Sequence, residues 1–401
     1  MIGLELPDNL IEMKKNMNNL AKDVLRPIAR KYDEQEHVYP KELDVFRGMT
    51  GAMGGGAKKD KGSGEKKAPP PEGVIGQNMN VMIAVEEMGW GDCGLMLTFP
   101  GAGLGNAAID AVATEEQLER FGKKWAAMAI TEAGSGSDSG SITTTAKLEG
   151  DEWVLNGEKI FVTCADRCEV VVVWATVDRS AGKAGIKSFV VEKGTPGFEL
   201  DHLEDKLGMR ASDTGTMVLN DCRIPKNNIL GSAEVVQSKS TAGFKGVMKT
   251  FDNTRPMVGI MATGVARAGV DLTREKMKEN GIALDYNENV NNISSMQREF
   301  YLMEANLEAM RLLAWRAAWM ADNKLANSLE ASMCKAKGGR DGTRITHKCC
   351  ELLGPMGFSQ KELAEKWMRD CKILDIFEGT GQIQHLVVAR NVLGLSSKEL
   401  K

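Results

Sequence analysis

The spacing of apolar residues along the chain changes twice, and each change predicts a change in secondary structure. Residues 8–35 and 74–121 carry apolar side chains at helical spacing. Residues 127–225 instead alternate with a period of two, in β-branched runs separated by Asn-Gly, Gly and Pro. From residue 235 the helical spacing returns and continues to the end.

This order predicts an α+β protein with three domains: a helical N-terminal domain at 1–126, a middle antiparallel β domain at 127–234 and a C-terminal helical bundle at 235–401. A length of 401 residues agrees with two or three domains. Residues 51–73 are rich in Gly, Lys and Pro, and Met53 is their only large apolar residue. Such a segment cannot bury a core, so we expect a mobile surface insert there.

Three local signals predict where elements begin or turn. Thr114 is followed three residues later by Gln117, which indicates a capping box at a helix start. Asn156-Gly157 falls among β-branched residues and predicts a hairpin turn. Pro256 follows a group of hydroxyl and charged residues, which predicts that a helix begins close to it.

Composition and charge exclude several classes of function. The net charge is -4, whereas proteins that bind nucleic acid or membrane surfaces usually show a basic balance. No apolar run is long enough to span a membrane, and the acidic start fits neither a secretory signal nor a transit peptide. We therefore expect a cytoplasmic protein. Eight cysteines without a CxxC pair, and only four histidines, indicate reduced thiols and no metal site.

Two segments could hold an anionic or planar group. Residues 129–141, AITEAGSGSDSGS, leave backbone N–H groups open for an anion or a polar ring edge, although most such segments are linkers. Phe161, Val162 and Thr163 end a predicted strand and offer a flat apolar face with one hydroxyl. That face suits a planar heterocycle; the competing interpretation is ordinary sheet core.

Two further segments place charge beside apolar residues. Asp252 and Arg255 lie near the predicted helix start, where the guanidinium could balance a carboxylate or contact a phosphate. Glu378 follows the apolar run 373–377 and precedes the loop 379–381. A carboxylate in such surroundings is suited to a raised pKa and could remove a weakly acidic C–H proton. A capped, solvated helix start remains the alternative for both segments.

Taken in order, five segments resemble the acyl-CoA dehydrogenase family, in its medium- and short-chain-like form: ITEAGSGSD, NGEKIFVT, LGMRASDT, FDNTRP and IFEGTGQIQ. The similarity runs over about residues 75–398. It implies that the C-terminal helices form a four-helix bundle and that FAD binds between this bundle and the β domain. It also implies a dimer or tetramer, and we expect a homotetramer.

The resemblance assigns site residues by motif. Those expected to contact FAD are Ile130, Thr131, Gly136, Ser137, Phe161, Val162, Thr163, Glu351, Gly354, Thr380 and Gln382. Those expected near the acyl-CoA substrate are Ser137, Asp252, Arg255 and Gly379.

Glu378 matches the family's catalytic base. Some members carry the base at the position of Thr254, which cannot serve, so Glu378 is the single candidate. The implied reaction is α,β-dehydrogenation of an acyl-CoA thioester to trans-2-enoyl-CoA, with Glu378 taking the α-proton and flavin N5 the β-hydride. Electron-transferring flavoprotein is the expected electron acceptor. The alternatives are an enoyl-CoA reductase running the reverse reaction and a weakly active or silent subunit of a hetero-oligomer.

Some positions depart from the family pattern. Ala283 and Tyr286 stand where the family has an Arg-x-x-Phe-Gly segment that reaches the FAD of a neighbouring subunit. Glu351 replaces a Gln, and its carboxylate would repel a pyrophosphate unless protonated or turned away. Both changes predict weaker FAD contacts between subunits, or a different partner subunit that supplies them. Leu97 and Phe99 fall at the expected end of the acyl pocket, where an apolar floor fits an alkyl or aromatic acyl group.

Overall fold

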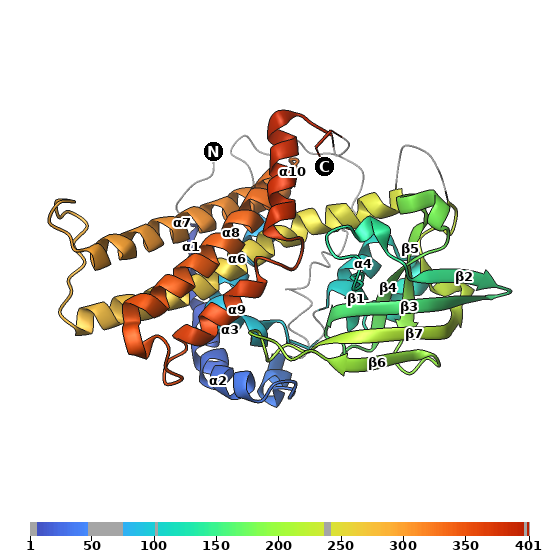
Figure 1. Cartoon of the computed structure of the whole chain (residues 1–401), viewed down its shortest axis with the longest axis horizontal. Helices are drawn as coiled ribbons and strands as arrows, with labels where there is room; N and C mark the ends of the chain where they lie inside the picture. The colour runs from blue at the N-terminus through green and yellow to red at the C-terminus, as the bar shows by residue number, and fades with distance from the viewer. Residues whose placement is uncertain (1–5, 47–74, 101–102, 236–241, 397–398, 401) are drawn as a thin grey trace.

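A helical part and a β part lie side by side in the molecule, and one long helix, α6 (Ala242–Glu279), runs along both (Figure 1). The computed structural model describes residues 6–46, 75–100, 103–235, 242–396 and 399–400, except for the side chains of 242–253. The predicted insert at 51–73 lies outside these residues.

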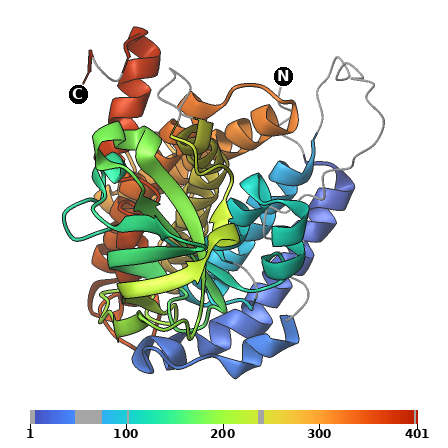
Figure 2. The same ribbon diagram turned by 90° about the vertical axis from the view of Figure 1, so that its right-hand side faces the viewer.

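The N-terminal helices precede the sheet in the chain: the earlier ones share a core with the C-terminal helices and the last two share one with the sheet (Figure 2, turned by 90° from Figure 1). They are α1 (Asp8–Leu20), a π-helical turn (Ala21–Leu25), α2 (Arg26–Glu34), a 3-10 turn (Lys41–Phe46), α3 (Gln77–Met96), α4 (Leu104–Val112) and α5 (Glu115–Phe121). The predicted capping box is confirmed at α5, because Thr114 Oγ1 accepts from Gln117 N at 3.2 Å and Gln117 Oε1 from Thr114 N at 3.0 Å.

The middle sheet has the strand order β6-β7-β3-β2-β4-β5-β8, with β1 paired to β4. Its strands are β1 (Ala126–Ala129), β2 (Thr145–Glu149), β3 (Glu152–Thr163), β4 (Val170–Thr176), β5 (Ile186–Glu192), β6 (Phe198–Leu203), β7 (Thr214–Pro225) and β8 (Ile229–Leu230). The predicted antiparallel arrangement holds except where β4 pairs in parallel with β1 and β2. Val171 and Val173 of β4 enter one core while Val170 and Val172 enter another, so this strand is buried on both faces.

The Asn-Gly pair lies inside β3, so the predicted hairpin turn at that position is wrong. The turn that joins β2 to β3 instead contains Gly150, which has a φ of 61°. Gly157 has a φ of 152° and sits where the register between β3 and β7 shifts. A Cβ there would lie 2.4 Å from Thr144 Oγ1, so close approach, not a turn, requires the glycine.

The C-terminal part contains α6 (Ala242–Glu279), α7 (Ser295–Asp322), α8 (Ser328–Leu353), α9 (Ala364–Ile373) and α10 (Gly381–Leu393). The predicted helix start near Pro256 is wrong, because this proline lies inside α6. Proline in a helix interior removes one backbone hydrogen bond, yet α6 continues past it, and its apolar face from Met257 onward is packed in the core.

Small residues let the helices approach closely around α6. A Cβ at Gly259 would lie 2.4 Å from Cys334 Sγ on α8, and one at Gly264 would lie 2.2 Å from the carbonyl oxygen of Glu86 on α3. The first and third domains therefore share one continuous hydrophobic core, to which α3 contributes as much as the bundle helices do.

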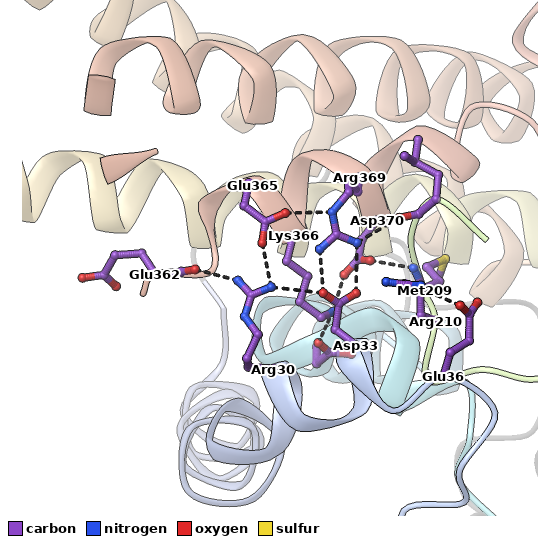
Figure 3. Close-up of polar contacts among 12 residues, drawn as sticks. Arg30, Asp33, Glu36, Met209, Arg210, Glu362, Glu365, Lys366, Arg369 and Asp370 are labelled. Carbon is purple, nitrogen blue, oxygen red and sulfur yellow. Dashed lines mark hydrogen bonds and ion pairs between the residues drawn. The ribbon is translucent and has the colours of Figure 1, made fainter. Parts of the chain in front are cut away.

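A buried ionic cluster joins all three domains where α2, α3, α9 and the β6–β7 loop meet (Figure 3). We call it the junction cluster, and its members are Asp33, Asp92, Lys366, Arg369 and Asp370. Lys366 Nζ lies 2.5 Å from both Asp92 Oδ2 and Asp370 Oδ2. Asp370 Oδ1 accepts from Met209 N at 2.6 Å, and Arg369 pairs with Asp33 at 2.6 Å. Every charge of the cluster thus has an opposite charge beside it.

Candidate functional site

Two of the predicted cofactor segments lie against each other at the edge of β3. Ile160 N donates to the carbonyl oxygen of Thr131 at 2.9 Å. Lys159 Nζ donates to the carbonyl oxygen of Ile130 at 3.1 Å and to Glu132 Oε1 at 2.7 Å. Motifs that are 30 residues apart in sequence, by the numbers of Ile130 and Ile160, therefore form one wall.

Glu132 anchors this wall. Its carboxylate accepts hydrogen bonds from the backbone N–H groups and hydroxyls of Thr143 and Thr144, at distances between 2.6 and 2.9 Å. Burial alone would raise the pKa of Glu132, but these bonds and Lys159 outweigh it and lower that pKa to about 2. Burial in turn lowers the pKa of Lys159 to about 8. Sequence analysis missed the ion pair between Glu132 and Lys159. The one available signal was the alternation of Lys159 with apolar residues along the strand.

The end of β3 divides the flat apolar face that the sequence predicts, because Phe161 faces outward while Val162 follows the competing interpretation of ordinary sheet core. Phe161 is 60% exposed, while its neighbour Val162 is 1% exposed and belongs to the sheet core. Phe161 has a φ of 57°, a conformation that is costly for a residue with a side chain and is enriched at functional sites. Nearby, no atom lies within 4 Å of a Cβ added at Gly134 or Gly136, and Ser137 is exposed. An exposed ring beside open backbone fits a flavin dinucleotide.

The second part of the site surrounds Glu378. Thr254 Oγ1 donates to Glu378 Oε2 at 2.7 Å, which links α6 to the loop before α10. Burial raises the pKa of Glu378, and Thr254, Arg255 and Lys335 oppose that rise. The raised pKa confirms the expectation from the apolar residues that precede Glu378. The helix-cap alternative is wrong, because Thr380 caps α10 by accepting from the backbone N–H of residue 383 at 3.3 Å.

The backbone around Glu378 is held in an uncommon conformation. Glu378 has a φ of 58° and Gly379 a φ of 92°. Gln384 on α10 donates from Nε2 to the carbonyl oxygens of both residues at 3.3 Å. Gln384 Oε1 is buried and has no hydrogen-bond partner among the residues that the structure describes. A strained residue held by a dedicated side chain is typical of a catalytic position.

Lys335 is a member of this site that the sequence did not reveal. Its side chain on α8 is fully buried, and burial lowers its pKa to about 8 against the attraction of Asp375 and Glu378. The available signal was its place next to Cys334 in a run of small residues, which indicates a closely packed helix face.

Three further predicted cofactor residues, Glu351, Gly354 and Gln382, lie at the end of α8 and the start of α10. Glu351 is exposed at the end of α8, where its ion pair with Lys348 lowers its pKa, so its carboxylate is ionised and turned to solvent. Gly354 has a φ of 58° and ends α8, and Gln382 is exposed on α10. Arg255 is 4% exposed, whereas the side chain of Asp252 lies outside the described residues.

The loop that departs from the family pattern makes contacts within its own chain. Tyr286 is 65% exposed and donates from its hydroxyl to Glu304 Oε2 at 2.9 Å. The carbonyl oxygen of Ala283 accepts from Gln297 Nε2 at 2.7 Å. Along the described part of the chain, no helix combines the length and apolarity needed to cross a membrane.

Comparison with known proteins agrees with this architecture. Models of the N-terminal, middle and C-terminal domains of acyl-CoA dehydrogenase match residues 7–129, 127–222 and 241–393. The short-chain specific acyl-CoA dehydrogenase of Rattus norvegicus is 34% identical over 98% of this chain and 92% of its own length. Acryloyl-CoA reductase (NADH) of Anaerotignum propionicum is 31% identical over 95% of this chain and 93% of its own length.

A solved structure shares the same arrangement. Butyryl-CoA dehydrogenase from Megasphaera elsdenii has a TM-score of 0.82 and 27% identity, and the match covers 98% of this chain and 100% of that one. The three domain matches and the full-length identity together show that this chain belongs to the acyl-CoA dehydrogenase family.

Proposed function

We propose that this FAD-dependent acyl-CoA dehydrogenase oxidises a short-chain acyl-CoA thioester to trans-2-enoyl-CoA, with Glu378 as the base that removes the α-proton. The observation that carries the assignment of the base is the setting of Glu378: a carboxylate with a raised pKa, hydrogen-bonded by Thr254 and held at a φ of 58°. A base with these properties suits abstraction of a weakly acidic C–H proton.

The chemistry divides between the protein and its cofactor. FAD, when bound, supplies the acceptor for the β-hydrogen, which leaves as a hydride. Glu378 takes the α-proton, and its partial desolvation makes it a stronger base than a carboxylate in water. Thr254 fixes Oε2 of that carboxylate, and we assign the other oxygen, Oε1, to the α-proton. Phe161 and the wall beside Thr131 orient the cofactor and exclude water from it.

A short acyl chain is supported by two observations. The rat short-chain enzyme and the butyryl-CoA dehydrogenase structure both align over nearly the whole chain. At the expected end of the acyl pocket, Phe99 is 3% exposed and packs on Phe46 with ring centroids 5.0 Å apart. An aromatic pair there limits the room for a long alkyl group.

The test is anaerobic flavin bleaching by a panel of acyl-CoA thioesters. We expect butyryl-CoA to bleach the purified FAD-bound enzyme fastest, with slower reaction for octanoyl-CoA and little for palmitoyl-CoA or glutaryl-CoA. If none of the four bleaches the flavin, the proposed activity is refuted. If palmitoyl-CoA reacts fastest, the activity stands and the proposed chain length is refuted.

An enoyl-CoA reductase running the same reaction in reverse is the second candidate. It is favoured by the acryloyl-CoA reductase relative, which matches 95% of this chain. The two candidate functions differ in the electron partner. To distinguish them, the reduced enzyme is mixed with crotonyl-CoA and, separately, with oxidised electron-transferring flavoprotein, and the rate of flavin reoxidation is measured. Faster flavin reoxidation by the flavoprotein supports the dehydrogenase direction, and faster reoxidation by crotonyl-CoA supports the reductase.

We also propose that electron-transferring flavoprotein is the natural acceptor and that the enzyme is a cytoplasmic homotetramer. The silent-subunit alternative is disfavoured because Glu378 is present and set up as a base. Light scattering after size-exclusion chromatography of the chain expressed alone measures the oligomer. A tetramer with one FAD per chain supports self-assembly, and a colourless monomer supports a hetero-oligomer.

A further inference from the structure

Lys335 lies on the face of α8 that is enclosed by α6 and by the loop carrying Glu378. A Cβ added at Gly338 would lie 2.7 Å from Gly259 Cα of α6, and one at Gly339 would lie 2.6 Å from Asp375 Cα in the loop. Residues three and four positions apart share a helix face, so Lys335 projects from the same closely packed face, one turn earlier. No room remains there for bulk water.

The ammonium group of Lys335 is unusual because it is buried without a hydrogen bond. The residue is 0% exposed, and its Nζ has no hydrogen-bond partner within the described ranges of the chain. Buried lysines are normally paired, since an unpaired buried charge is costly. A cation kept in this state needs a reason beyond packing, which an apolar side chain of similar length would satisfy better.

The charges around Lys335 come from α6 and from the loop before α10. Asp375 and Glu378 attract it, and Arg255 repels it. Glu378 in turn faces the cations Arg255 and Lys335 and the hydroxyl of Thr254. Among the charged groups that act on Glu378 in the described structure, Lys335 is therefore the one that α8 contributes.

We propose that Lys335 is a positioning residue for Glu378: the buried ammonium favours the ionised form of the Glu378 carboxylate and draws it toward α8, without touching the substrate. The proposal rests on the proposed role of Glu378. Burial lowers the pKa of Lys335 to about 8, so the ammonium is still present near neutral pH. An unpaired cation can respond to a carboxylate that changes charge, whereas a lysine locked in an ion pair cannot.

Removal of this cation has a predictable sign. A nearby positive charge favours the ionised carboxylate, so the Lys335→Met variant should raise the pKa of Glu378 further. The ionised fraction of the base then falls on the acid limb of the rate profile, so flavin reduction slows there and recovers as the pH rises. We expect this limb to move up by about one pH unit, with rates on it falling by up to about tenfold and rates on the alkaline plateau unchanged.

The experiment compares FAD-bound Lys335→Met, Lys335→Gln and Lys335→Arg with wild type and with Lys337→Met. Lys337 also lies on α8 but pairs with Asp341 at 2.5 Å, which makes it a matched control. The rate of anaerobic flavin bleaching by butyryl-CoA is measured against pH, and bound FAD is quantified for each variant. The upward shift should appear in the two neutral variants and be absent from Lys335→Arg and Lys337→Met.

A second readout does not depend on turnover. The infrared C=O band of protonated Glu378, identified by its loss in Glu378→Gln, is titrated in each variant, and its midpoint should rise in Lys335→Met. Unchanged midpoints, or a pH-independent loss of rate, would overturn the proposal and leave Lys335 a packing residue. If wild type is not bleached at all, the proposed function fails, while the infrared titration still tests the coupling of Lys335 to Glu378.

Discussion

Two buried lysines in the C-terminal domain, Lys366 and Lys335, have opposite electrostatic surroundings. In the junction cluster, Lys366 lies 2.5 Å from the carboxylates of both Asp92 and Asp370 (Figure 3). Burial alone would lower the pKa of Lys366, but these two carboxylates raise it well above its ordinary value. Lys335 is equally buried, has no hydrogen-bonded carboxylate among the residues that the structure describes, and has a pKa lowered to about 8.

This difference indicates two roles for buried charged side chains. Lys366 holds domains together, whereas Lys335 lies beside a carboxylate that takes part in the chemistry. A buried ion pair with complete partners is costly to break, so Lys366 fixes α9 against α3, while Asp370 fixes α9 against the β6–β7 loop. Around Glu378 the carboxylate is only partly compensated, and burial raises its pKa. Perturbed titration of this kind is typical of functional sites.

The largest expected effect is a loss of activity when the charge of Glu378 is removed. Glu378→Gln keeps the shape of the side chain but removes the base, so bleaching of the flavin by butyryl-CoA should slow by about a thousandfold or more. Stopped-flow absorbance under anaerobic conditions measures this rate. Bound FAD should be unchanged, because the side chain of Glu378 is assigned to the substrate rather than to the cofactor.

Glu279→Gln is the matched control, since it makes the same chemical change at an exposed glutamate on α6. It should react like wild type. A Glu378→Gln enzyme that bleaches at the wild-type rate would show that another group removes the proton, and the assignment of the base would have to be withdrawn.

The next largest expected effect is a loss of stability when Lys366 is removed from the junction cluster. Lys366→Met leaves Asp92 and Asp370 buried without their shared cation, so the free energy of unfolding should fall by about 3–5 kcal/mol. Lys335→Met loses no hydrogen bond to any described residue and should change stability far less. Urea unfolding followed by circular dichroism compares the two variants. Equal losses of stability would remove the distinction between a paired and an unpaired buried lysine.

The sequence predicted the order of domains and the reactive carboxylate because both depend on local pattern. Apolar periodicity predicted the helices and strands, and the apolar residues 373–377 predicted the raised pKa of Glu378. The hairpin turn at Gly157 failed because a glycine needed for close approach to Thr144 looks the same in sequence as one needed for a turn. The helix start predicted near Pro256 failed for a similar reason, since a proline inside α6 looks the same in sequence as one in the first turn of a helix.

Long-range pairing explains what the sequence could not give. Lys366 and Asp92 are 274 residues apart, and no local signal connects them. Lys335 was hidden for a related reason: a lysine on an amphipathic helix is normally solvated, and only the close approach of α6 and the 375–378 loop buries it. The Glu351 carboxylate, expected to face a pyrophosphate, pairs instead with Lys348 four-fifths of a helical turn away.

A third buried lysine extends the comparison to an intermediate case. Lys159 has one carboxylate partner, Glu132, whose pKa is lowered to about 2 by hydrogen bonds that outweigh burial. A carboxyl group with a lowered folded-state pKa contributes stability above its unfolded pKa of about 4.5 and loses it as the pH falls toward 2. Wild type should therefore lose roughly 3 kcal/mol over that window from this group.

Glu132→Gln should flatten this part of the stability profile and lower stability at neutral pH. Urea midpoints measured at several pH values between neutral and acid provide the test. A profile with the same slope in wild type and in Glu132→Gln would mean that the acid sensitivity comes from other carboxylates, such as those of the junction cluster.

A smaller effect concerns the hydroxyl that holds the base. Thr254→Val removes the 2.7 Å hydrogen bond to Glu378 and keeps the volume of the side chain. Loss of a bond to a charged group raises the pKa of Glu378 and should slow flavin bleaching at neutral pH about tenfold. Thr254→Ser retains the hydroxyl and should stay near wild type. Equal rates in Thr254→Val and Thr254→Ser would contradict a role for this bond in catalysis.

The smallest expected effect concerns Glu351, because the comparison between paired and unpaired lysines applies only to buried charges. Glu351 is exposed, and its partner Lys348 lies in solvent with it, so water already compensates both groups. Glu351→Gln should therefore leave the urea midpoint unchanged. Bound FAD per chain, measured from flavin absorbance, should also match wild type, because the carboxylate is turned away from the two groups of site residues. Tighter FAD binding in this variant would instead place Glu351 beside the cofactor of a neighbouring subunit, where removing its charge relieves repulsion.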